Sequence, residues 1–185
     1  NGVSYDLDVF NNLMKEQKER ARQARGEMQS MNKQSKDLME FTEPSSFTYG
    51  EESINAKVIG LFEDGVKVDV LTGNGAVILD TTNFYAESGG QVADTGSLDN
   101  ENVSLRVTNV TKAPNKQFLH HVEVLFGELH VGDELTCNID VKRRRMITRN
   151  HSSVHLLQEA LTEVLGDHIA QQGSFVNEEY SHFDF

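Results

Sequence analysis

The chain has 185 residues, with 17 Lys and Arg side chains against 29 Asp and Glu, and a formal net charge of -12. This balance argues against a surface that binds polyanions generally, so any contact with nucleic acid has to come from a local patch. The single cysteine excludes an internal disulfide and a zinc site made of cysteines alone. No apolar run approaches the roughly 20 residues of a membrane helix, and no secretory leader is present. We therefore expect an excerpt from a longer, soluble, cytoplasmic protein with no membrane partner.

Residues 1–44 predict a helical linker. They are rich in Lys, Arg, Glu, Gln, Met and Ala, which favour helix, and small or apolar side chains recur at steps of three and four from about Asp6. This narrow stripe is typical of a solvated connector helix with one packed edge, and it also fits a coiled coil or docking on a neighbouring domain. Pro44 and the two serines after it break the pattern and set the boundary.

Residues 45–141 predict a small antiparallel β-barrel. The dipeptides Asp64-Gly65 and Asn74-Gly75 are typical of tight hairpin turns, so consecutive strands should pair antiparallel. Short segments rich in β-branched residues predict six strands, over residues 56–61, 66–72, 76–80, 103–111, 118–126 and 134–141.

Residues 142–185 predict a helix followed by two strands. One apolar face predicts the helix over about residues 151–165, with Asn150 as its N-terminal cap. The strands are expected over residues 174–176 and 180–185, and the sequence stops inside the second one. We therefore expect this last domain to be incomplete. The apolar face of the predicted helix consists of Val154, Leu157, Leu161 and Leu165.

Two histidines stand four residues apart on the predicted helix. This spacing brings the imidazoles of His151 and His155 to one side, within reach of one ion. They supply two of the ligands that a tetrahedral Zn²⁺ needs, and Ser152 stands where HExxH peptidases carry a glutamate base. Metalloprotease chemistry is therefore disfavoured, and the pair fits either half of a zinc site or two histidines that hydrogen-bond in a groove.

A local basic patch precedes these histidines. Because phosphate attraction is screened within a short distance, such a patch could steer one RNA end into a cleft beside His151. Equally, its arginines could pair with the surplus carboxylates on a solvated face. Five cations form the patch: Lys142, Arg143, Arg144, Arg145 and Arg149.

Residues 80–96 form the most informative stretch. The Gly89-Gly90 pair allows close approach of the backbone to a ligand, and polar groups around it could orient a polar substrate. From the chemistry alone, an ordinary loop between strands remains the favoured explanation. The polar side chains are those of Thr82, Glu87, Gln91 and Asp94.

This stretch resembles the motif T-x-F-Y-x-x-x-G-G-Q-x-x-D-x-G of alanyl-tRNA synthetase editing domains and of the related AlaX trans-editing deacylases. Residues 149–157, 166–168 and 171–174 are similar to the zinc helix and following strand of the same family. Residues 5–25 are similar to the segment that joins the tRNA-binding helical region of full synthetases to their editing domain. The resemblance therefore favours a synthetase fragment over a free-standing deacylase.

The resemblance implies an α+β fragment with a connector helix, a small antiparallel barrel and a truncated α/β editing core that contains the HxxxH helix. It implies hydrolysis of serine or glycine esters of tRNA(Ala), because an alanine pocket rejects both amino acids poorly. ATP-dependent alanylation, with ATP and magnesium, would belong to the parent enzyme. The expected partners are the acceptor end of tRNA(Ala) and the remaining domains of that enzyme, and a non-catalytic tRNA-docking module is the rival from another class.

Site roles follow from the resemblance position by position. His151 and His155 would be zinc ligands, Gln171 would lie near the scissile ester, and Thr82 would contact the serine hydroxyl. The family's remaining zinc ligands, a Cys and a His, lie beyond Phe185, so this chain holds half of the site and should bind zinc weakly or not at all. Zinc would either activate water or anchor the substrate. The pocket wall would be formed by Glu87, Gly89, Gly90 and Gln91.

Two further positions depart from the family pattern. Cys137, in the predicted barrel, matches neither of the missing zinc ligands. His182 stands where relatives usually carry Arg before Phe-Asp-Phe. The resemblance therefore implies no metal role for the first residue and leaves the second without an assigned substrate role.

Overall fold

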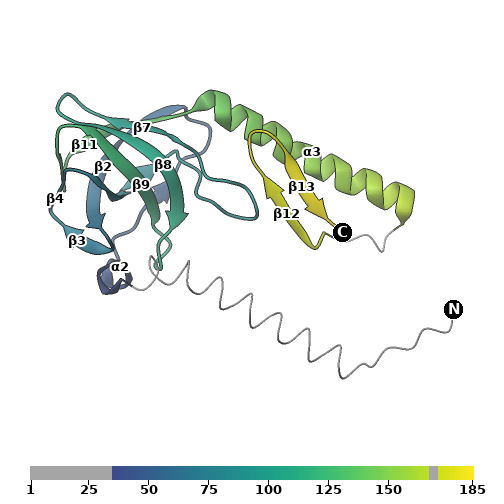
Figure 1. Cartoon of the computed structure of the whole chain (residues 1–185), viewed down its shortest axis with the longest axis horizontal. Helices are drawn as coiled ribbons and strands as arrows, with labels where there is room; N and C mark the ends of the chain where they lie inside the picture. The colour runs from purple at the N-terminus through teal and green to yellow at the C-terminus, as the bar shows by residue number, and fades with distance from the viewer. Residues whose placement is uncertain (1–34, 167–170) are drawn as a thin grey trace, which may run out of the picture.

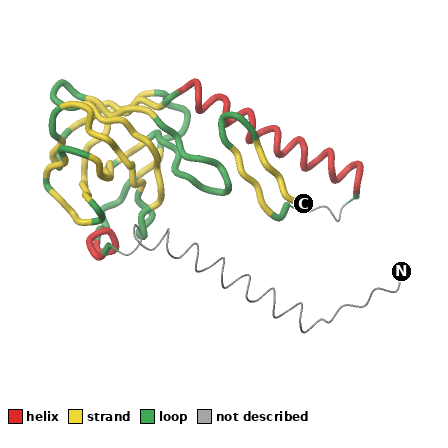
Figure 2. The backbone as a smooth tube through the Cα atoms, in the orientation of Figure 1, coloured by secondary structure: helices red, strands yellow, loops and turns green. Residues whose placement is uncertain are grey.

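The computed structural model describes residues 35–166 and 171–185, so the predicted linker helix and its stripe over residues 1–34 lie outside the described residues. The described part is an α+β structure built on a closed antiparallel barrel, with a long helix leading away from it (Figures 1 and 2). Strands pair around the barrel in the order β11-β7-β8-β9-β5-β2, and β11 pairs with β2 to close it. Their bounds are β2 Ser53–Glu63, β5 Asn74–Leu79, β7 Gly96–Asp99, β8 Ser104–Lys112, β9 Phe118–Phe126 and β11 Glu134–Ile139.

Alternating side chains fill the barrel. In β11, for example, Leu135, Cys137 and Ile139 are buried while the residues between them are not, as the two-residue period of a strand requires. Short strands complete the wall at its ends. They are β3 (Val66–Val68) beside β2, the parallel pair β1 (Ser46–Phe47) and β6 (Thr81–Thr82), and the antiparallel pair β4 (Val70–Leu71) and β10 (Leu129–His130).

The turn predictions had different outcomes. Asp64-Gly65 is the tight turn between β2 and β3, with φ values of 49° and 82°, so that prediction is confirmed. The prediction for Asn74-Gly75 is wrong, because both residues lie inside β5 and pair with β9. A Cβ atom on Gly75 would lie 2.7 Å from the carbonyl oxygen of Phe62, so this glycine permits a close approach of strands rather than a turn.

The end of the predicted linker packs on the barrel. Helix α2 (Lys36–Glu40) begins at Ser35, whose hydroxyl accepts a hydrogen bond from the amide of Leu38. Leu38 and Phe41 are buried, and the Phe41 ring meets Phe62 edge-on at 5.7 Å between centroids. The residues just before Pro44 are therefore part of the barrel's packing.

Helix α3 (Val141–Leu165) begins ten residues earlier than its apolar face predicts. Asp140 caps it by accepting a hydrogen bond from the amide of Arg143 at 2.9 Å. The cap predicted at Asn150 is wrong, because that side chain lies inside the helix and donates to the carbonyl of Asn177. No helix in the described residues is long and apolar enough to cross a membrane.

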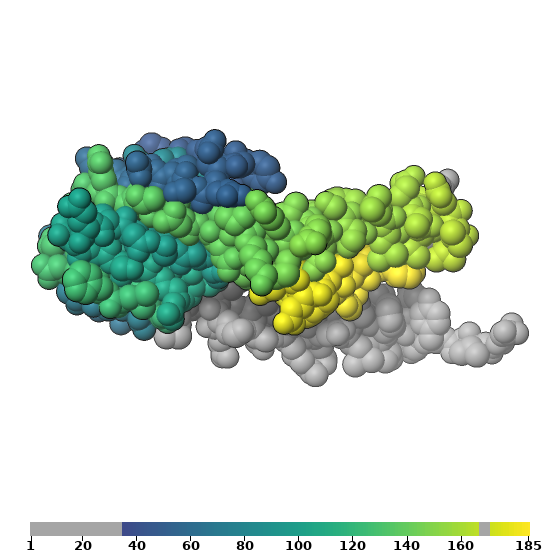
Figure 3. All heavy atoms as spheres, turned by 90° about the horizontal axis from the view of Figure 1, so that it is seen from above, coloured from purple at the N-terminus to yellow at the C-terminus, as the bar shows by residue number. Residues whose placement is uncertain are grey.

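A hairpin of β12 (Gly173–Val176) and β13 (Ser181–Asp184) lies along α3 (Figures 1 and 3). Both predicted strands are thus present within one or two residues of their expected bounds. Ile147 and Val154 of the helix bury against Val176. Leu157 and Leu165, which belong to the predicted apolar face, remain 45% and 48% exposed, so the helix uses its first half for packing.

Burial of His120 predicts a loss of stability in mild acid. The ring is fully buried, its Nε2 lies 2.8 Å from the Thr82 hydroxyl, and burial lowers its pKa to about 4. The folded ring therefore stays neutral while the unfolded ring takes up a proton below its ordinary pKa of about 6.5. From about pH 7 to pH 5 this group should lower the free energy of unfolding by roughly 2 kcal/mol. Urea unfolding at both pH values measures the loss.

The control for this prediction is His120→Gln, which keeps a polar side chain in the site but does not titrate. This variant should lose less stability between the two pH values than the unchanged protein. His121, whose pKa burial also lowers, contributes equally to both proteins. An identical pH dependence in the two proteins would show that the buried ring is not the titrating group.

Candidate functional site

A cavity of about 330 Å³ lies between α3 and the loop that carries the Gly-Gly pair. The helix contributes both histidines, and the loop contributes Gln91. The cavity is lined by Tyr49, Tyr85, Gln91, Arg144, Thr148, His151, Ser152 and His155.

The two histidines lie side by side at this cavity. Their ring centroids are 5.2 Å apart and the rings are inclined by 31°. The Nδ1 atom of His151 lies 2.5 Å from Oε1 of Gln91. Because an amide oxygen only accepts, Nδ1 carries the proton and the Nε2 lone pair of His151 remains available as a ligand or as a hydrogen-bond acceptor.

The Gly-Gly loop is held by the hairpin. The amide of Val176 donates to the carbonyl of Gly90 at 2.8 Å, and the amide of Val92 donates to the carbonyl of Val176 at 3.0 Å. Gly90 has a φ of 82°, and a Cβ there would overlap the carbonyl oxygen of Ser174. The close approach at Gly90 is therefore to the backbone of β12, and the role of Gly89 and Gly90 in a pocket wall stays a prediction.

A buried ion pair joins α3 to the same loop. Nε of Arg144 donates to both carboxylate oxygens of Asp94, at 2.8 and 2.9 Å, and its Nη2 donates to Asp94 and to the carbonyl of Asn83. The side chains of Arg144 and Asp94 are only 13% and 2% exposed, and the hydrogen bonds that Arg144 donates to the Asp94 carboxylate raise the pKa of Arg144. This pair fixes the angle between the loop and the helix that carries the histidines.

The rest of the predicted basic patch is largely paired within the chain. Arg143 donates to Glu178 at 2.9 Å, which lowers the pKa of that carboxyl, and Arg145 donates to Glu52 at 2.9 Å. Among the described residues, no carboxylate lies within ion-pair distance of Lys142 or Arg149. Arg143, Arg144 and Arg145 thus pair with carboxylates of the chain itself, which was one of the two expectations for the patch. Lys142 and Arg149 remain for an external anion.

Five of the residues predicted for catalysis or substrate contact do not line the cavity: Thr82, Glu87, Gly89, Gly90 and Gln171. Thr82 is fully buried in the barrel, where its hydroxyl contacts His120 and accepts from the amide of Phe84. Glu87 is exposed to solvent. Gln171 is exposed two residues before β12 and donates to the Ser174 hydroxyl at 2.9 Å.

The described residues contain no cluster of three or more His, Cys, Asp or Glu side chains that could hold a metal ion. His151 and His155 therefore stand as a pair. Cys137 is buried in the barrel, and burial raises the pKa of its thiol to about 12. Because the thiolate is the metal ligand, this cysteine is unsuited to the role.

The sequence did not predict four of the lining residues: Tyr49, Tyr85, Thr148 and Ser152. A signal for Thr148 was present, because Arg144, Thr148, His151 and His155 follow at steps of four, three and four and so share one helix face. The late predicted start of the helix concealed it. Tyr49 lies between β1 and β2, and nothing in its local sequence points to α3.

Comparison with known proteins places the chain among aminoacyl-tRNA synthetases. Residues 1–143 match the family model for class II (A) tRNA synthetases, which ends where α3 begins. The whole chain is 48% identical to the alanine–tRNA ligase of Lactobacillus johnsonii and 47% identical to that of Lactobacillus gasseri. It is 44% identical over 99% of its length to the enzyme of Staphylococcus saprophyticus. In each case the chain spans 21% of the relative's length.

Proposed function

Because the chain belongs to the class II (A) tRNA synthetase family, we propose that it is the part of a cytoplasmic alanyl-tRNA synthetase that hydrolyses seryl- or glycyl-tRNA(Ala). The chain is 48% and 44% identical, over 100% and 99% of its length, to two alanine–tRNA ligases, and this similarity supports such a parent enzyme. ATP-dependent alanylation would be the work of other parts of the parent enzyme. The tRNA(Ala) acceptor end would be the partner of this part.

The observation that carries the proposal is the pair of imidazoles at a cavity shared with the Gly-Gly loop. His151 and His155 come from one helix face, and Gln91 comes from a loop about 60 residues away in sequence. A volume of about 330 Å³ is at the small end of ligand sites. This size suits the aminoacyl end of a tRNA and favours small side chains such as those of serine and glycine.

The imidazole pair fits half of a zinc site. The hydrogen bond from Nδ1 of His151 to Gln91 is the outer contact that zinc-binding histidines make, and it directs the free Nε2 away from Gln91. The two rings supply two of the four ligands of a tetrahedral ion. When bound, zinc would supply Lewis-acid chemistry at the ester or would lower the pKa of a water molecule.

The chain's own groups position the substrate. Arg144, neutralised by Asp94, forms a fixed wall of the cavity. The Ser152 hydroxyl lines the cavity and is free to hydrogen-bond a polar group of the substrate. The roles of Gln171 beside the ester and of Thr82 and Glu87 in substrate contact stay predictions. For Thr82 that role requires the hydroxyl to leave His120.

Replacing Gln91 by leucine is expected to release the His151 ring. The variant loses the acceptor that keeps the proton on Nδ1, so the ring should shift toward the Nε2-protonated form. Nitrogen NMR of this chain measures the tautomer directly. In the parent enzyme the same change should weaken zinc binding about 10- to 100-fold, as measured by chelator competition.

Gln91→Glu is the matched variant for this prediction. It keeps an acceptor oxygen at the same place, so the Nδ1-protonated form should persist. If Gln91→Leu and Gln91→Glu both leave the His151 tautomer unchanged, the hydrogen bond between Gln91 and His151 does not position the ring.

The proposed function is tested in the full parent synthetase. His151→Ala should abolish hydrolysis of seryl-tRNA(Ala) while tRNA binding and alanylation remain. His130→Ala, an exposed histidine on β10, should leave hydrolysis unchanged. A parent enzyme that binds tRNA(Ala) but never cleaves the ester would show that this region is a docking module.

A further inference from the structure

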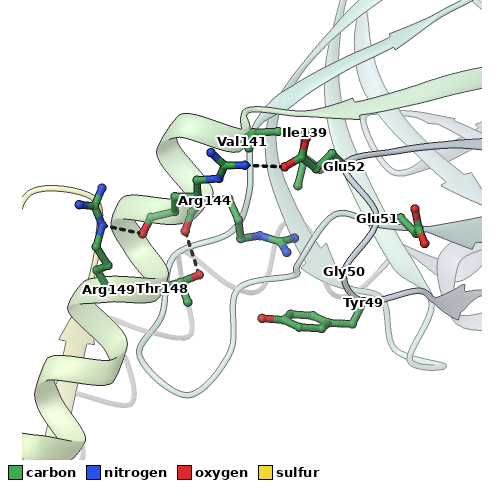
Figure 4. A pocket seen from close by; sticks show the side chains of 10 residues that line it. Tyr49, Gly50, Glu51, Glu52, Ile139, Val141, Arg144, Thr148 and Arg149 are labelled. Carbon is green, nitrogen blue, oxygen red and sulfur yellow. Dashed lines mark hydrogen bonds and ion pairs between the residues drawn. The ribbon is translucent and has the colours of Figure 1, made fainter.

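A second cavity, of about 460 Å³, lies between the first turns of α3 and the segment around Tyr49, and Figure 4 shows its lining side chains. Tyr49, Arg144 and Thr148 line both cavities, so the two share one wall. His155 stands seven residues after Thr148, which is about 10 Å along a helix axis. The shared wall therefore joins the histidines to a second space at a distance that a single nucleotide can span.

Tyr49 gives the second cavity an aromatic surface. Its side chain is 72% exposed, although it neighbours a buried ion pair. The Arg144 guanidinium lies over it, 5.8 Å from the ring centroid, and Figure 4 shows both groups projecting into the cavity from opposite sides. Asp94 holds this guanidinium in place. A fixed planar cation beside an exposed ring is a surface on which nucleobases stack.

The other walls combine apolar surface with charged side chains, among them those of Glu51 and Glu52. Ile139 and Val141 provide apolar surface at the foot of α3. Arg145 is neutralised by Glu52, to which it donates a hydrogen bond at 2.9 Å. Arg149 also lines the cavity and uses only its Nε, which donates to the carbonyl of Arg145 at 3.3 Å. Its remaining donors suit one phosphate at the rim, which argues for a nucleoside in the cavity rather than a polyanion.

We propose that the second cavity binds the 3′-terminal nucleoside of the tRNA, with its base against Tyr49 and its phosphate beside Arg149. This arrangement places the ribose at the shared wall of Arg144 and Thr148, and the aminoacyl ester in the histidine cavity. The inference rests on the proposed hydrolysis of the ester and adds the site that holds the base. Tyr49 is then a substrate-binding residue and takes no part in bond cleavage.

The test separates KM from kcat in the parent synthetase, with seryl-tRNA(Ala) as substrate. Tyr49→Ala should raise KM for hydrolysis about 10-fold, the effect of losing one stacked base, and leave kcat within a factor of about two. Tyr49→Phe keeps the ring and should keep the KM. Phe126→Ala removes an equally exposed aromatic ring from the end of β9 and should change neither constant.

A direct binding measurement accompanies the kinetics. Titration of this chain with the tetranucleotide RNA ACCA should shift the amide NMR signals of Tyr49, Val141 and Thr148, and Tyr49→Ala should weaken the binding. A KM unchanged in Tyr49→Ala, or shifts confined to other parts of the chain, would overturn the nucleoside site even if His151→Ala abolishes hydrolysis. If His151→Ala leaves hydrolysis intact, the proposed function fails instead, whatever Tyr49 does.

Discussion

Replacing Arg144 by methionine is expected to lower the free energy of unfolding by about 3–5 kcal/mol, because it leaves a buried carboxylate without its counter-ion. Asp94 is 2% exposed and receives three of the hydrogen bonds that Arg144 donates. The carboxylate of Asp94 also accepts a hydrogen bond from the amide of Tyr85 at 2.7 Å. Methionine preserves most of the packing volume of Arg144, so the loss of unfolding free energy measures the missing ion pair and not a cavity. Urea unfolding of this chain near pH 7 measures it.

Arg145→Met is the matched control one residue along α3. Its ion pair with Glu52 is 69% and 60% exposed, and exposed pairs contribute at most about 1 kcal/mol. A double-mutant cycle with Asp94→Asn isolates the coupling between Arg144 and Asp94. Equal losses in Arg144→Met and Arg145→Met would mean that the buried pair does not hold the loop against the helix.

The barrel was predictable because its strands carry a local signal. Residues 118–126 form a run rich in apolar, β-branched and aromatic side chains and were predicted with the observed bounds. β7 was missed because it follows the glycine-rich stretch without a β-branched run, and it is a strand only through its pairing with β8 and β11. The turn prediction for Asn74-Gly75 failed because this dipeptide is common in tight turns, whereas here both residues pair with β9 and are held as a strand. Local patterns thus identified the sheet, and non-local pairing decided its ends.

The site was predictable only where its chemistry is local. The spacing of His151 and His155 and the motif around Gln91 are visible in the sequence, and the structure brings these three residues to one cavity. The partner of Arg144 is 50 residues away in the chain, and Tyr49 reaches the cavity from a third segment. Such contacts follow from the docking of α3 on the barrel, which no periodicity encodes.

Replacing Gly90 by alanine is expected to separate the Gly-Gly loop from the hairpin. The new methyl group would overlap the backbone oxygen of Ser174, and backbone cannot move aside as a side-chain end can. Together with the positive φ of 82°, this should cost about 2–4 kcal/mol. The hydrogen bond from Val176 to the carbonyl of Gly90 would break first. Hydrogen exchange at the amides of Val92 and Val176 measures the opening.

Gly89→Ala distinguishes crowding from backbone strain. Gly89 also has a positive φ, 59°, but a Cβ there would meet nothing within 4 Å. It should cost only about 1 kcal/mol and leave the hairpin amides protected. Because Gln91 follows Gly90 and holds His151, Gly90→Ala should also shift the His151 tautomer, whereas Gly89→Ala should not. If both variants left Val92 and Val176 equally protected, the loop would not depend on β12, and the position of Gln91 would need another cause.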